Sequence, residues 1–112
     1  MAGIDVNALV AGIKSAANGV LTRDVSTLRG FAEEQVKAIA QQAAIVAAGI
    51  ADGSIGPDIR DFFLDSLEEM AKSFANTLGG MTMVMIEEVW NAIVKAVFDE
   101  INRATGLSLV TP

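Results

Sequence analysis

The sequence contains no cysteine, no histidine and no tyrosine. These absences exclude disulfide bonds, zinc sites built from cysteine or histidine, and catalysis by a thiol or an imidazole. Aromatic residues make up only 5% of the 112 residues and there are two prolines, whereas 52% of the residues are hydrophobic. Ala, Leu, Met, Glu and Lys, which are strong helix formers, together account for 42 of the residues, and 18 of these are alanine. The composition therefore predicts a single all-α domain over residues 1–112, with a core of aliphatic side chains.

Basic residues are also scarce. Eight Lys and Arg residues stand against fourteen Asp and Glu residues, which gives a formal net charge of −6. The basic residues are scattered singly along the chain, so the sequence contains no basic patch. Because binding to a phosphate backbone requires clustered positive charge, we expect no nucleic-acid partner.

A long apolar run is missing as well, although the mean hydropathy of +0.44 is high. The stretch 38–51 is uncharged but short and contains two glutamines, and the stretch 81–98 carries two glutamates and a lysine. A membrane-spanning helix needs roughly 20 apolar residues, so we expect no transmembrane span. No basic segment is followed by an apolar block, and a secretory signal is not expected. The sequence does not decide whether the protein lies in the cytoplasm or within a particle. Its high content of apolar residues favours their burial between protein chains.

An apolar stripe runs in helical phase from Val6 to Ile50. Its mean step of about 3.7 residues is close to the period of an α-helix. The stripe predicts one long helix over residues 5–51, straight or bent near Asn18-Gly19, and the alternative is two helices with a turn at that dipeptide. A continuous helix would be roughly 70 Å long. Other subunits would then have to cover its N-terminal half.

Glycine and proline divide the rest of the chain. Gly53 is expected to end the first helical region, and Pro57 to begin a helix over residues 57–78. Gly79-Gly80 separates this helix from a last one over residues 81–104, because the two apolar faces would lie on opposite sides of one continuous helix. The expected core faces run from Ile59 to Leu78 and from Met83 to Ile101, with Trp90 as an anchor. The predicted fold is an all-α bundle of three to four helices, a long N-terminal helix packed against an antiparallel helical hairpin.

No residue pattern predicts a catalytic or metal site. The densest polar cluster is an acidic run, which we interpret as a solvated helix face because it lacks the spacing of a calcium loop. Neither glycine-bearing turn is followed by the Lys-Ser/Thr pair of a phosphate-binding loop. We therefore expect no enzyme activity, no cofactor, no metal and no small-molecule substrate. The acidic run consists of Asp58, Asp61, Asp65, Glu68 and Glu69.

Three groups of residues are candidates for contact with other chains. The first is the N-terminal part of the stripe, the second a face of small residues in the 38–51 stretch, and the third a methionine-rich face at the start of the last helix. Small residues allow close helix approach, and methionine adapts to irregular partners. The candidates are Val6, Val10, Ile13, Leu21, Ala40, Ala44, Ala47, Ala48, Met81, Val84 and Met85.

The leading hypothesis is a non-enzymatic structural protein, a helical subunit that self-associates into a homo-oligomer or a larger multi-subunit assembly such as a virion component or a filament. One alternative is a membrane-active helical protein that inserts as an oligomer, which the missing span and the negative charge disfavour. A second alternative is an adaptor that binds a partner helix in a methionine-lined groove.

Overall fold

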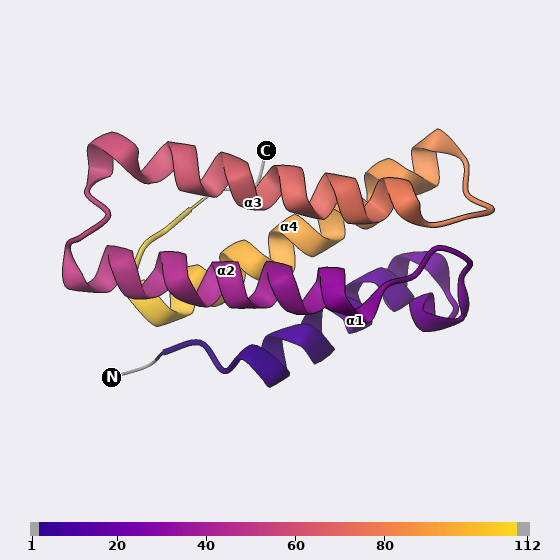
Figure 1. Ribbon diagram of the computed structural model, residues 1–112, viewed down its shortest axis with the longest axis horizontal. Helices are drawn as coiled ribbons and strands as arrows, with labels where there is room; N and C mark the ends of the chain where they lie inside the picture. Colours follow the sequence, from indigo (N-terminus) through magenta and orange to yellow (C-terminus); the bar gives the residue numbers. More distant parts are fainter. Residues whose placement is uncertain (1–2, 110–112) are drawn as a thin grey trace.

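The computed structural model describes residues 3–109, which form an all-helical bundle (Figure 1). The helices are α1 (Val6–Leu21), α2 (Glu33–Asp52), α3 (Pro57–Thr77) and α4 (Met83–Thr105), and a short 3-10 turn, η1 (Val25–Thr27), lies between α1 and α2. Within residues 3–109 there is no β-strand. The prediction of an all-α bundle is confirmed.

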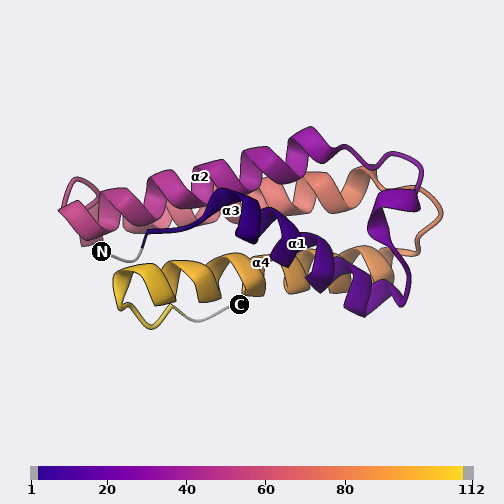
Figure 2. The same ribbon diagram turned by 90° about the horizontal axis from the view of Figure 1, so that it is seen from below.

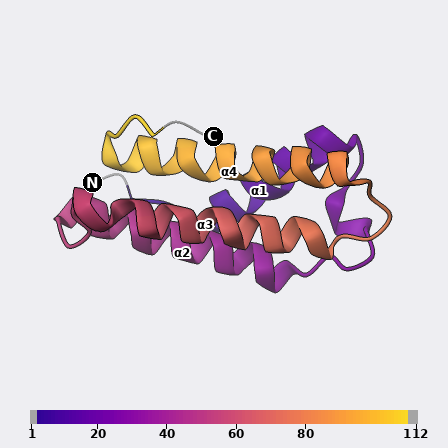
Figure 3. The same ribbon diagram turned by 90° about the horizontal axis from the view of Figure 1, so that it is seen from above.

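The helices are arranged in two layers. The antiparallel helices α2 and α3 form the layer nearest the viewer in Figure 1, and α1 and α4 cross behind them (Figure 2, Figure 3). The α1–α2 and α3–α4 connections lie at one end of the bundle and the α2–α3 connection lies at the other. Because α4 packs against all three other helices, the hydrophobic core lies between the two layers.

The first helical region is broken, so the prediction of one helix across residues 5–51 is wrong. The alternative of two helices is right, but the break lies after Leu21 rather than at Asn18-Gly19. Thr22 adopts a left-handed conformation with φ of 55°, and the chain then reverses direction before α2. The apolar stripe crosses this break without a change of phase because Val25, in η1, is buried in the same core as the flanking helices.

Asn18 holds the reversed segment in place from within α1. Its side-chain oxygen accepts a hydrogen bond of 2.7 Å from the backbone N–H of Val25. Asp24 supports the same segment, since its carboxylate accepts hydrogen bonds from the backbone N–H and the hydroxyl of Ser26 at 2.9 and 2.7 Å. Asn18 belongs to a dipeptide that is typical of turns, but here it lies within α1 and its side chain holds the turn that begins at Thr22.

The Asp24 hydrogen bonds make this segment sensitive to acid. The Ser26 hydroxyl and backbone N–H hold the pKa of Asp24 below its ordinary value. A lowered folded-state pKa stabilises the fold above the unfolded pKa of about 4, and this contribution is lost as the pH falls through the folded value. Asp24→Asn keeps an oxygen acceptor but removes the titration. We expect the stability difference between wild type and Asp24→Asn to stay constant from about pH 7 to about pH 5 and to shrink as the pH falls below about 4.

Urea denaturation followed by circular dichroism at several pH values measures this difference. Asp61→Asn is the matched control, because the exposed Asp61 side chain makes no hydrogen bond with other residues in the described part of the chain. A wild-type advantage over Asp24→Asn that is independent of pH would contradict the role given to the carboxylate.

The helical hairpin is placed as predicted. Gly53 ends α2 with φ of 85°, Pro57 begins α3, and Gly79-Gly80 lies in the connection to α4. Most of the expected core faces are buried, from Leu67 to Leu78 and from Ile93 to Ile101. They differ at their starts and in width, since Ile59 and Met83 are exposed while Leu64, Val89 and Phe98 are also buried. The reason is that α3 and α4 pack against each other and also against the folded-back first half of the chain.

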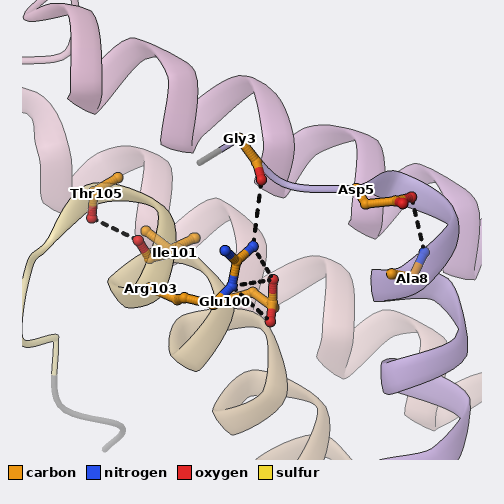
Figure 4. A network of polar contacts seen from close by, with 7 residues as sticks. All are labelled: Gly3, Asp5, Ala8, Glu100, Ile101, Arg103 and Thr105. Atoms are coloured by element: carbon orange, nitrogen blue, oxygen red, sulfur yellow. Dashed lines mark hydrogen bonds and ion pairs between the residues drawn. The ribbon is translucent and has the colours of Figure 1, made fainter. Parts of the chain in front are cut away.

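The start of α1 meets the end of α4 in a small polar network (Figure 4). Asp5 caps α1 by accepting a hydrogen bond of 3.2 Å from the backbone N–H of Ala8. Arg103 forms an ion pair of 2.9 Å with Glu100 and also donates to the backbone carbonyl of Gly3 at 3.4 Å. The hydrogen bonds that Arg103 donates to the Glu100 carboxylate raise the pKa of Arg103, which stays charged. The first described residues are therefore held against α4.

Candidate interaction surface

The chain itself covers most of the stripe that was expected to contact other subunits. Five of the eleven candidate residues are buried in the core of the bundle, and the rest of the first stripe packs beside them. The folded-back arrangement of α1 and α2 removes the long, half-covered helix on which the expectation depended. In this fold these five residues are not available to a partner. They are Val10, Ile13, Leu21, Ala40 and Ala47.

The remaining candidates lie nearer the surface. Val6, Met81 and Met85 are partly buried and pack against the core. Ala44 is partly buried and Ala48 is exposed, and both line a shallow hollow together with Gly3, Ile4 and Ala104. The small-residue face of α2 is therefore approached by the chain's own first described residues and by the end of α4. Val84 is the one candidate whose large apolar side chain is mainly exposed, at 64%.

A cluster of exposed apolar side chains lies on the outer face of the α2–α3 layer. Phe62 is 72% exposed, Ile45 is 63% exposed and Ile59 is 43% exposed. At about 100° per residue, Ile45 points away from the buried Ala43 and Phe62 points away from the buried Leu64, so both face outward. They also lie at the same end of the bundle, roughly 8–12 Å from the α2–α3 connection at 1.5 Å per residue. We name Ile45, Ile59 and Phe62 the outer patch.

An open groove of about 340 Å³ lies along the seam between α2 and α3. Gln35 and Ala38 line it on α2, and Ser66, Met70 and Ser73 line it on α3. Ala38 precedes Ile45 by two helical turns and Ser66 follows Ile59 by two turns, so patch and groove share one face. Together they form a strip along the bundle in which small and apolar side chains alternate with the polar Gln35 and Glu69.

A second exposed apolar site lies at the opposite end of the bundle, at the start of α4. Met83 is 85% exposed and Val84 is 64% exposed, and we name these two residues the tip patch. Beside Met83 is a hollow of about 210 Å³ that Ile86 and Trp90 also line. The tip patch thus combines two protruding apolar side chains with an adjacent aromatic-lined depression.

Trp90 is held by α3. Its indole N–H donates a hydrogen bond of 3.0 Å to the backbone carbonyl of Glu68, and the Lys72 ammonium lies 5.2 Å from the ring centroid. Partial burial raises the pKa of Glu68, with a further contribution from the charges of Asp65 and Glu69. These contacts fix the Trp90 ring as one wall of the hollow.

Sequence analysis missed the outer patch. The signal was the adjacent pair Phe62 and Phe63, because neighbouring residues on a helix diverge by about 100° and only one of them can face the core. The rings are perpendicular, with centroids 5.4 Å apart, and Phe63 is the one that packs against the core.

The polar side chains of the described residues form no centre for metal binding. The acidic run on α3 stays mostly on the surface, and within residues 3–109 no group of three or more acidic side chains is arranged to hold a metal ion. None of the helices in this range combines the length and the apolar character that crossing a membrane requires. The features that stand out are the two exposed apolar patches.

No family model, no curated protein sequence and no solved structure matches this chain. The class of protein is therefore defined by the fold alone, a small all-helical bundle.

Proposed function

We propose that this chain is a non-enzymatic structural protein, a helical subunit that associates with copies of itself and with other chains in a larger assembly. The observation that carries the proposal is the exposure of large apolar side chains at two separate sites, the outer patch and the tip patch. Apolar side chains that protrude in groups are typical of surfaces that are covered in an assembly. The absence of cysteine and histidine from the sequence supports the non-enzymatic part.

The tip patch suits contact between two copies. Its surroundings are mixed in charge, since Lys72 and Glu87 both border the hollow beside Met83. Two copies that meet there would place the Met83 side chain of each in the Ile86–Trp90 hollow of the other. Opposite charges at the rim favour such a two-fold contact rather than opposing it. A pair joined in this way would be the building unit of a filament or particle.

Light scattering across a dilution series, without lipid or detergent, tests the self-association. We expect the wild-type mass to exceed the 11.7 kDa of one chain at micromolar concentration. Because Met83 and Val84 are exposed, the double variant Met83→Ser/Val84→Ser is expected to fold normally and to return to the mass of one chain.

The matched control is Ile45→Ser/Phe62→Ser, which changes two exposed apolar residues of the outer patch and should leave the mass unchanged. A wild-type chain that stays at the mass of one chain at every concentration would contradict self-association. A mass that survives loss of the tip patch would place the contact elsewhere on the surface.

A further inference from the structure

The outer face of the α2–α3 layer carries an excess of acidic side chains. At about 100° per residue, Glu34 and Asp52 lie within 20° of Ile45 around α2. On α3, Asp58, Asp65 and Glu69 lie within about 60° of Phe62. All five carboxylates are on exposed residues. The outer patch and the groove are therefore bordered by acidic side chains along both helices.

The basic residues of the same two helices offset only part of this charge. Lys72 lies about 20° from Asp65 around α3, but its ammonium is placed over the Trp90 ring of α4. Arg60 is two residues from Phe62 and therefore lies on the opposite side of α3. Lys37 lies about 80° around α2 from Ile45, on the side away from the groove. With Lys37 and Lys72 counted against the five carboxylates, three negative charges remain on this face.

We propose that this face binds a basic amphipathic helix from a different protein. The apolar side of such a helix would cover Ile45, Ile59 and Phe62 and continue along the groove towards Ser66 and Ser73. From Phe62 to Ser73 the strip is roughly 16 Å long at 1.5 Å per residue, which matches about three turns of a partner helix. Anchors spaced three and four residues apart would follow this seam, as in other helix-in-groove contacts.

Charge decides between this partner and a second copy of the chain. Two copies that met through this face would bring ten carboxylates together around a small apolar centre. Like charges placed opposite each other oppose association, whereas lysine or arginine on a partner helix would be attracted to the same border. The inference adds a partner of defined chemistry to the assembly role proposed above, and it uses a different surface from the tip patch.

The test uses the full chain and a 14-residue synthetic peptide of leucine and lysine, designed as an amphipathic helix and labelled for fluorescence anisotropy. A second peptide replaces every lysine with glutamate. We expect the lysine peptide to bind and the glutamate peptide not to bind. Ile45→Ser/Phe62→Ser should weaken binding of the lysine peptide by roughly tenfold or more, as for central apolar anchors of other interfaces.

Two further variants separate the apolar and the electrostatic contributions. Met83→Ser/Val84→Ser is the matched control, because it removes equally exposed apolar residues at the other end, and it should leave peptide binding unchanged. Asp58→Asn/Asp65→Asn/Glu69→Gln should weaken binding and reduce its dependence on salt.

Three results would overturn the proposal: equal binding of both peptides, unchanged binding to Ile45→Ser/Phe62→Ser, or a fall in the scattering mass of the peptide-free protein caused by this double variant. The last result would show a second copy on the outer patch. A monomeric wild type that still binds the lysine peptide through the outer patch would contradict only the proposed self-association, so the two proposals can fail separately.

Discussion

Replacement of Gly30 by alanine is expected to lower the free energy of unfolding by about 3 kcal/mol or more, among the larger effects of single substitutions. Gly30 has φ of 87°, a conformation that alanine adopts at a cost of about 1 kcal/mol. An added Cβ would in addition lie only 1.9 Å from the backbone carbonyl oxygen of Thr77, the last residue of α3.

The clash at Gly30 is hard to relieve, because the neighbouring backbone is tied to the same loop. The N–H of Gly79 donates a hydrogen bond of 2.7 Å to the carbonyl of Arg29. If Thr77 moved away from the new methyl group, this hydrogen bond between the two connections would be stretched. Relief of the clash therefore requires the two connections at this end of the bundle to separate.

Gly53→Ala provides the matched control for Gly30→Ala. Gly53 has nearly the same φ, 85°, but a Cβ there meets no atom within 4 Å. This variant should lose only the conformational contribution of about 1 kcal/mol. Urea denaturation followed by circular dichroism measures both variants. Equal stability of the two would show that the α1–α2 and α3–α4 connections are not in the close contact described above.

The second large effect is expected at Phe74. Phe74→Ala should lower the free energy of unfolding by about 3–5 kcal/mol, through lost burial and the cavity left behind. The side chain is almost fully buried and makes an edge-to-face contact with Phe31, with ring centroids 5.9 Å apart and an interplanar angle of 81°. Total stabilities of small domains are roughly 5–15 kcal/mol, so this variant would retain a small margin.

Phe62→Ala is the control for Phe74→Ala, because it makes the same chemical change on the same helix at an exposed position. Its free energy of unfolding should stay within about 0.5 kcal/mol of wild type. Thermal or urea unfolding of the two variants side by side is sufficient. A loss at Phe62 as large as that at Phe74 would mean that the outer face of α3 is packed rather than exposed.

The second half of the fold could be predicted from the sequence because glycine and proline residues mark the ends of its helices. Gly53, Pro57 and Gly79-Gly80 end or begin helices for local reasons, and the structure places helix ends at or near each of them. The α1–α2 connection contains one such residue, Gly30, but α1 ends nine residues earlier, at Leu21. Apolar residues in a compact turn that faces the core can keep the spacing of a helix, as Val25 does, so periodicity alone could not separate the two cases.

The candidate interaction surface depended on information that only the packing supplies. Because α1 folds back onto the bundle, residues that were predicted to contact other subunits, including Ile13 and Leu21, are buried within the chain. The rotation of α3 against α2 and α4 then decides that Ile59 and Phe62 are exposed while Leu64 is buried. The spacing of residues along one helix determines how their side chains point relative to one another. It does not determine which side of the helix faces the core.

The pairing of α1 with α4 has a consequence for the order of events in folding. These helices share the largest helix–helix contact in the bundle, yet they lie at the two ends of the described chain. The entropic cost of closing a loop rises by about 0.6 kcal/mol for each doubling of its length, so this contact is far more costly to nucleate than the α2–α3 turn. Contacts of this kind form late, after the local turns have brought the helices together. We therefore expect substitutions in the α1–α4 contact to speed unfolding more than they slow folding.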